Sequence, residues 1–150
     1  MIIIDKISER KNEFINLPDE KLSKKQSLEN CLLNSSHWKE KKKEIYEKKI
    51  KVALKINSDE EFILGKTDLP YIKMIQINFL NFKDGRPFTL AKELRKKFLF
   101  RGEIRASGDV LPDQFVFLLR CGFDTVEIKE VEKDTWLELL EFDEGLYYQP

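Results

Sequence analysis

The residues best suited to bind a charged ligand lie in short polar segments beside hydrophobic runs in the second half of the chain. Three of them read Asn-Phe-Lys-Asp-Gly-Arg at 81–86, Gly-Glu-Ile-Arg-Ala-Ser-Gly-Asp-Val at 102–110 and Arg-Cys-Gly-Phe-Asp at 120–124. Gly and Asp are typical of turns, and arginine pairs with carboxylates and other oxyanions. Because joints between strands and helices hold the ligands of many α/β proteins, these segments are candidate binding positions.

Polar and apolar residues alternate along four β-prone runs, at 51–56, 74–79, 103–107 and 125–129. Successive side chains of a strand point to opposite faces, so the pattern predicts a sheet with one apolar and one polar face. Helices would pack on the apolar face, whereas fully covered parallel strands are usually apolar throughout. The polar face would carry Lys55, Gln76, Asn78, Glu103, Arg105, Ser107 and Glu127.

Two interpretations of the polar face follow. In the first, it forms a cleft in which Lys55 and Arg105 receive an anion while Glu103 or Glu127 holds their geometry. In the second, the N-terminal hairpin or the lysine-rich helices cover this face, and its charges pair with one another.

The joints add further candidates. Asp84 and Asp109 suit turn or capping roles, and Asp113 would favour a helix dipole from the first turn. Arg86 has no turn-forming role and is therefore the better candidate for binding. The full set of candidate ligand-binding or partner-binding residues is Lys55, Asn78, Asp84, Arg86, Glu103, Arg105, Asp109, Asp113, Gln114 and Glu127.

Several classes of site have no support in the sequence. His37 is the only histidine and is expected to have a surface or packing role, so a Ser-His-Asp triad or a histidine metal site has no basis. Cys31 and Cys121 form no CxxC pair, and no GxGxxG motif follows a strand. We therefore expect no metal, no cofactor and two reduced thiols.

Charge and hydropathy argue against nucleic acid and membranes as partners. Lys and Arg number 27, as do Asp and Glu, so no overall field attracts a polyanion. A nucleic-acid patch at 39–51 is the least favoured interpretation, since glutamates interrupt its lysines. No apolar run approaches the roughly 20 residues of a membrane-spanning helix, and residues 1–5 are too short for a signal peptide. We expect a cytoplasmic protein.

The 150 residues suffice for one domain with its own core. A hairpin of residues 2–4 and 14–17, then two lysine-rich helical pieces within 19–49, are predicted for the N-terminal part, 1–50. Residues 51–150 are predicted to form a β/α core, in which four parallel strands alternate with helices in an open curled or half-barrel-like sheet. Helices are expected at 58–64, 87–98, 109–122 and 136–140, and the aromatic tail at 147–150 is not expected to float free.

The combined motif resembles a known family. The resemblance is carried by the segments at 82–86, 91–95, 102–106, 108–111, 113–114, 120–124 and 148–149. These are similar to the bacterial family called domain of unknown function 934, often described as a probable oxidoreductase involved in sulfite reduction. Two departures are Pro87-Phe88-Thr89, where the family usually has Gly-Tyr-Ser, and Pro112 in place of an arginine.

The resemblance implies a link to assimilatory sulfate reduction, because such proteins are commonly encoded beside sulfite reductase and the sulfonucleotide reductase. It assigns no catalytic residue, and the sequence has no dinucleotide, iron–sulfur or haem signature. We therefore expect an accessory protein that binds one of these reductases or a small anion. The alternative is a small α/β enzyme acting on an anionic metabolite, with Arg105 and Lys55 on the anion and Asp109 or Glu127 as acid/base.

Overall fold

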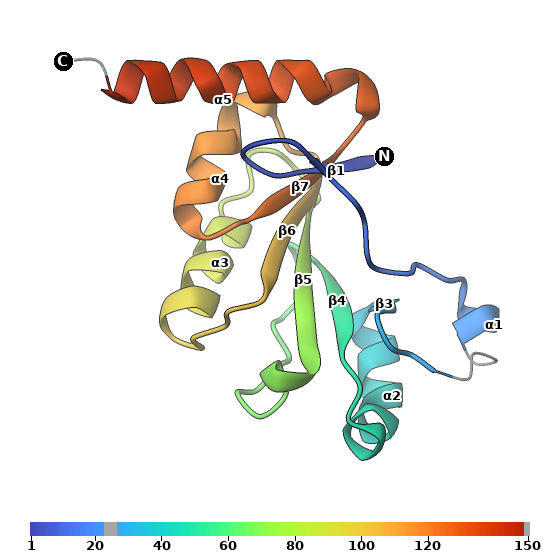
Figure 1. Ribbon diagram of the computed structural model, residues 1–150. Coiled ribbons are helices and arrows are strands. Elements are labelled where there is room, and N and C mark those ends of the chain that lie inside the picture. Colours follow the sequence, from blue (N-terminus) through green and yellow to red (C-terminus); the bar gives the residue numbers. More distant parts are fainter. Residues whose placement is uncertain (23–26, 149–150) are drawn as a thin grey trace.

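A seven-stranded mixed sheet forms the centre of the molecule in this computed structural model, which describes residues 1–22 and 27–148 (Figure 1). The strands lie in the order β2-β1-β7-β6-β5-β4-β3. They are β1 (Ile2–Ile4), β2 (Glu9–Arg10), β3 (Leu32–Leu33), β4 (Val52–Asn57), β5 (Ile72–Phe79), β6 (Glu103–Gly108) and β7 (Thr125–Ile128). The α-helices of the described residues are α1 (Asp19–Leu22), α2 (Ser35–Lys48), α3 (Arg86–Lys96), α4 (Phe115–Cys121) and α5 (Lys133–Tyr148). The predicted α/β class is confirmed.

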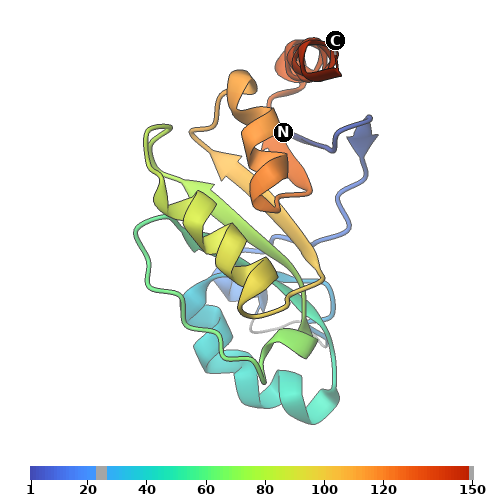
Figure 2. The same ribbon diagram turned by 90° about the vertical axis from the view of Figure 1, so that its left-hand side faces the viewer.

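Strands β3 to β7 run parallel and follow one another across the sheet in chain order. Right-handed crossovers between successive neighbours place their helices on a single face of the sheet. α2 connects β3 to β4, α3 connects β5 to β6, and α4 connects β6 to β7. Figure 2 shows α3 and α4 lying over the strands on this face.

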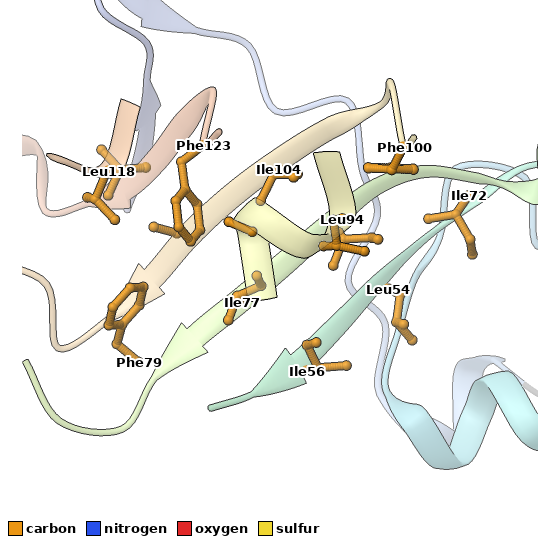
Figure 3. Packing of buried hydrophobic residues seen from close by; sticks show 14 of the residues in the cluster. Leu54, Ile56, Ile72, Ile77, Phe79, Leu94, Phe100, Ile104, Leu118 and Phe123 are labelled. Atoms are coloured by element: carbon orange, nitrogen blue, oxygen red, sulfur yellow. The ribbon is translucent and has the colours of Figure 1, made fainter. Parts of the chain in front are cut away.

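The hydrophobic core lies between that face and the helices. Ile56, Ile77 and Ile104 of the central strands are at most 1% exposed. Leu94 of α3 and Leu118 of α4 pack in the same cluster (Figure 3). Because burying an aliphatic side chain of this size stabilises by about 1.5–3 kcal/mol, this cluster is the main source of stability.

The N-terminal hairpin exists, but its second strand is not at 14–17 as predicted. β1 pairs with β2, within the segment expected to be the turn. Oδ1 of Asp5 accepts hydrogen bonds from the backbone N–H groups of Ile7 and Ser8, each at 2.8 Å. This side-chain turn reverses the chain early, and Arg10 then pairs with Asp5 at 2.8 Å.

The prediction of four parallel strands was short by one, because β3 lies inside the segment predicted to be helical. Ile15 forms an isolated parallel bridge with Cys31 and so leads into this edge strand. A two-residue strand carries no usable periodicity, which is why the pattern gave no sign of it. The second predicted helical piece corresponds to α2, whereas the helix of the first is limited, among the described residues, to the four residues of α1. Residues 23–26 and the last two residues of the predicted tail lie outside the described residues.

The helix predicted at 58–64 does not form; these residues are a turn followed by irregular chain. The acidic residue of the turn is used elsewhere: Glu60 accepts hydrogen bonds from Oγ of Ser35 at 2.6 Å and from the N–H of Asn57 at 2.9 Å. Ser58 stands where the N-cap of the predicted helix would lie, but its Oγ accepts from the N–H of Leu80 at 3.3 Å instead. Contacts distant in sequence therefore overrode the local capping signal.

A buried carboxylate fixes the connection between β4 and β5. Oδ1 of Asp68 accepts a hydrogen bond from the hydroxyl of Tyr46 and lies 3.0 Å from Nζ of Lys42. Oδ2 accepts from the N–H of Gly65 at 2.8 Å. Burial by itself would raise the pKa of Asp68, but these three donors outweigh it and hold the pKa below its ordinary value.

Candidate functional site

Rows of polar side chains cross the sheet on the face opposite the helices, in positions fixed by the strand register. The central row contains, from β4 to β7, Lys55, Gln76, Arg105 and Thr125. The next row towards the carboxyl ends contains Asn57, Asn78 and Ser107. Glu103 and Glu127 lie on the same face, beside Met74 and Ile3. The face is thus polar and continuous over four strands.

Arg105 is a buried cation whose charge is already paired. Its side chain is 2% exposed, and Nη2 lies 2.8 Å from Oε2 of Glu103. The same oxygen accepts from Nε of Arg105 at 3.0 Å and from Oγ1 of Thr125 at 2.8 Å. The N-terminal segment covers the pair, because Asn12 accepts from Nη1 at 3.2 Å and the ring of Phe14 lies 5.6 Å from the guanidinium. Around Arg105 the geometry therefore fits the second interpretation, in which the N-terminal part of the chain covers the polar face and its charges pair.

A chain of hydrogen bonds links the central row to the next one. Nε2 of Gln76 donates to Ser107, Oγ of Ser107 donates to Asn78, and Nδ2 of Asn78 donates to Asn57, each at 3.0 Å. Gln76 is 1% exposed, and its Oε1 accepts no hydrogen bond from the described residues. A buried acceptor without a donor costs about 1–3 kcal/mol. A hydrogen-bond donor brought to this oxygen of Gln76, which neighbours Lys55 in the row, would therefore be stabilising.

A cavity of about 310 Å³ opens beside Lys55 at the β3 edge of the sheet. It is lined by Asn16, Leu17, Leu32, Leu33, Asn34, His37, Lys55, Asn57 and Glu60. These residues come from the N-terminal segment, from β3 and the start of α2, and from the end of β4 with its following turn. The cavity therefore joins the polar face to the N-terminus of the 14-residue helix α2.

The electrostatics of this cavity favour an anion. Lys55 is half-buried, and its ammonium forms no ion pair or hydrogen bond with any side chain that the structure describes. Asn34 caps α2 by accepting from the N–H of His37 at 2.8 Å, and the first turn of a helix carries a partial positive charge. Glu60 is the one acid among the described residues that line the cavity, and its carboxylate already accepts two hydrogen bonds.

The sequence grouped Lys55 with Arg105, but the structure separates them. Two strand spacings, about 10 Å, lie between them in the register. Arg105 and Glu103 line a different cavity, of about 120 Å³, beneath residues 10–14. Glu127 lies on β7, three strands from Lys55, and is half-buried beside Ile3. Lys55 and Arg105 therefore line two separate cavities.

The Asp84–Arg86 joint is a local turn. Nη2 of Arg86 lies 2.8 Å from Oδ2 of Asp84, and the N–H of Arg86 donates to Oδ1 at 3.0 Å. The guanidinium of Arg86 therefore holds the pKa of Asp84 well below its usual range. Arg86 itself is 64% exposed at the start of α3, which Pro87 enters in its first turn as expected.

The joint after β6 is fixed by hydrogen bonds to the loop after β5. Asp109 does not cap the following helix as predicted; its Oδ2 accepts from the N–H of Phe82 at 3.1 Å. Gln114 donates to the carbonyl of Phe82 at 3.0 Å and accepts from the N–H of Leu111 at 2.9 Å. Asp113 is exposed in the 3-10 turn that precedes α4. These residues brace two loops, and none of them lines the Lys55 cavity.

Four polar residues of the cavity were missed by sequence reasoning: Asn16, Asn34, Asn57 and Glu60. One signal could have found Asn57, since extending the alternation of the β4 run by one residue places it on the same face as Lys55. Asn34 precedes Ser35-Ser36 and is itself a preferred N-cap residue. His37, assigned a surface or packing role, lies in the cavity wall. Asn16 and Glu60 reach the site only through the tertiary fold.

Metal-binding clusters and membrane-spanning helices are absent from the described residues. No group of three or more His, Cys, Asp or Glu residues there could hold a metal ion, and no helix there is long and apolar enough to cross a membrane. Cys31 and Cys121 are free and buried, and burial raises the pKa of the Cys121 thiol.

The comparisons with known proteins gave one family. Neither the curated proteins nor the solved structures contain a significant match to the chain. The family model described as "bacterial protein of unknown function" (DUF934) matches residues 53–150, about two thirds of the chain. This match spans β4 to the C-terminus and leaves out the N-terminal segment and most of the α2 side of the cavity. The chain is therefore a member of the bacterial family of unknown function DUF934.

Proposed function

We propose that the protein is a non-catalytic accessory protein of assimilatory sulfate or sulfite reduction that binds a small oxyanion in the cavity beside Lys55. The observation that carries this proposal is the half-buried Lys55, which lines a cavity of about 310 Å³ and whose ammonium has no partner among the described residues. A cation removed in part from water without a counter-charge is disfavoured, so an incoming anion supplies the missing interaction.

The shape of the site supports a small ligand. Lys55 provides a point charge from the sheet, the first turn of α2 provides a partial positive charge from the opposite wall, and Asn57 provides an amide. Sulfite and sulfate both offer three or more acceptor oxygens to such donors. The link to sulfur assimilation rests on the family resemblance carried by the motifs at 82–124.

The enzyme alternative has weaker support from the geometry. Its anion-holding pair was Lys55 with Arg105, and Arg105 is 2% exposed and paired with Glu103. Of its two proposed acid/base residues, Asp109 accepts from the backbone of Phe82, and Glu127 lies three strands away from Lys55.

The binding site is tested by titrating sulfite and sulfate into the purified, isotopically labelled protein and following backbone amide shifts. We expect the largest shifts at 34–37 and 55–57. Lys55→Met should weaken binding about 10–100-fold, because a charge-assisted hydrogen bond contributes about 1.5–3 kcal/mol. Lys39→Met, on an exposed position of α2, is the matched control and should bind as the unchanged protein does. Equal affinities of the two variants would contradict the assignment of the site.

Glu60 gives a test of the sign of the charge. Glu60→Gln removes the one acid that lines the cavity but keeps an oxygen that can accept from Ser35 or Asn57. We expect oxyanion affinity to rise several-fold, since an electrostatic repulsion is removed. A fall in affinity would show that the ligand carries a positive group at this position.

The accessory role is tested separately. The purified protein is mixed with purified sulfite reductase or sulfonucleotide reductase, and complex formation is followed by size-exclusion chromatography with light scattering. The protein alone should not turn over sulfite with nicotinamide or flavin donors. Sulfite reduction by the protein alone would reject the non-catalytic role. Failure of the protein to bind sulfite would reject the ligand site but not the non-catalytic role.

A further inference from the structure

A second cavity, of about 520 Å³, lies at the opposite end of the sheet, where the parallel strands begin. Its apolar floor includes Leu99 and Phe100, which follow α3. Among the described residues, its lining includes four cations, Lys51, Lys66, Lys73 and Arg101, and no acidic residue. Lys73 pairs with Glu29 at 3.6 Å, but Lys51, Lys66 and Arg101 form no ion pair with the described residues. We call this cavity the basic groove.

Leu99 occupies an unusual position within the basic groove. Its side chain is 67% exposed, and its φ of 55° lies in the left-handed region. At the end of a helix this conformation is usually taken by glycine or asparagine, because a Cβ atom makes it unfavourable. A strained backbone that holds an apolar side chain out to solvent is a feature of binding surfaces rather than of stable turns.

The charge of the groove calls for an acidic occupant with apolar anchors, and the C-terminal part of this chain has that composition. No Lys or Arg follows Lys133, whereas residues 138–150 read Glu-Leu-Leu-Glu-Phe-Asp-Glu-Gly-Leu-Tyr-Tyr-Gln-Pro, with four acids. Glu138 and Glu141 are exposed on α5. Figure 1 shows α5 across one end of the sheet, whereas the groove lies at the other end, beside the 3-10 turn (Leu69–Tyr71) that leads into β5.

A helix at one end of the molecule cannot fill a groove at the other end of the same copy, so the occupant comes from a second copy. We propose that the basic groove docks the acidic, aromatic C-terminal segment of another molecule of this protein, in a head-to-tail contact. A single-stranded nucleic acid is the competing polyanion. It binds by stacking bases on exposed rings. In the groove Leu99 is aliphatic, Phe100 is 5% exposed, and the half-buried ring of Phe98 already packs edge-on against Phe62 with Lys97 over it.

A contact of this kind leaves one groove and one segment open in each pair, so association continues to rings or short chains. Sedimentation velocity over a hundredfold range of concentration should therefore show an average mass that grows with concentration. The association should weaken with added salt, because it depends on exposed charges.

A charge exchange tests the contact directly. The groove variant carries Lys66→Glu and Arg101→Glu, and the segment variant carries Asp143→Lys and Glu144→Lys. Each alone should be monomeric, because like charges then face each other. Their equimolar mixture should associate again, since each supplies the complement of the other. Lys39→Glu with Lys43→Glu, on exposed positions of α2, is the matched control and should associate as the unchanged protein does.

Leu99→Gly separates binding from folding. It should leave the urea midpoint unchanged or raise it, because glycine relieves the left-handed strain, yet it should weaken association at least tenfold. The proposal is overturned by a protein that is monomeric at every concentration, by a mixture of charge variants that does not associate, or by full association of Leu99→Gly. It is also overturned if a labelled single-stranded oligonucleotide binds the groove and a peptide of residues 138–150 does not displace it.

Discussion

Removing either partner of the Arg105–Glu103 pair should destabilise the protein, but by unequal amounts. The two side chains are 2.8 Å apart, yet Arg105 is 2% exposed and Glu103 is 26% exposed. Glu103→Gln leaves a guanidinium in the interior with a neutral amide as its acceptor. Arg105→Met leaves a carboxylate that water reaches and that still accepts from Thr125 at 2.8 Å. The burial of the charge that remains therefore determines how much stability is lost.

The magnitudes follow from burial. Stripping a buried charge of its partner costs about 3–5 kcal/mol, and we take about 3 kcal/mol for Glu103→Gln because the amide keeps one acceptor. Arg105→Met loses charge-assisted hydrogen bonds, but methionine retains the apolar packing under Phe14, so about 1 kcal/mol is expected. The expected gap is about 2 kcal/mol, or about 4–8 °C in Tm for a chain of this size.

Urea denaturation of the two variants and of the double variant, followed by tryptophan fluorescence, measures this gap. The double variant should be more stable than Glu103→Gln alone, because it removes the stranded cation. Equal costs for the two single variants, or a larger cost for Arg105→Met, would refute the argument that burial of the remaining charge controls stability. An effect of Arg105→Met on sulfite affinity without loss of stability would place Arg105 in the ligand site instead.

Three further outcomes are expected. Asp68→Asn should lower the free energy of unfolding by about 2 kcal/mol at about pH 7. Because the pKa of Asp68 is lowered in the folded state, the difference in stability from the unchanged protein should shrink as the pH falls through that pKa towards about pH 2. Urea titrations at each pH measure this difference. Gly108→Ala should destabilise the protein severely, by about 3 kcal/mol or more, because φ is 85° and the added Cβ would lie 2.4 Å from the carbonyl oxygen of Phe79. Gly85→Ala is the control: its Cβ would meet no atom within 4 Å, so Tm should change by no more than about 2 °C. The buried thiol of Cys121, its pKa raised by burial, should react with a disulfide reagent only as fast as the protein unfolds; rapid labelling without denaturant would contradict the packing of α4.

The alternation of side chains was informative because it is a property of the extended backbone itself. A strand places Lys55 and Asn57, or Glu103 and Arg105, on one face whatever surrounds it, so the two-sided character of the sheet could be read from residues 51–129. The α/β class and α3 followed from equally local signals, namely the 3.6-residue period and Pro87 in the first turn.

Local signals failed where distant donors were stronger. Ser58 to Glu61 has the pattern of a capping box, yet the hydroxyl of Ser58 accepts from the N–H of Leu80 and the helix is not formed. Asp109 has the composition of a cap, yet it holds the loop at Phe82. In each case one side chain had two possible partners, and only the folded chain brings the stronger one within reach.

The sequence by itself determined that Lys55 and Arg105 lie on one polar face, because period-two alternation needs no tertiary contact. Only the tertiary structure decided that they have different roles. Residues 10–14 return over β6 and bury Arg105 against Glu103, whereas β3 and the start of α2 leave a cavity beside Lys55. The charge of a side chain is local information, but whether that charge is paired depends on which distant segment packs against it.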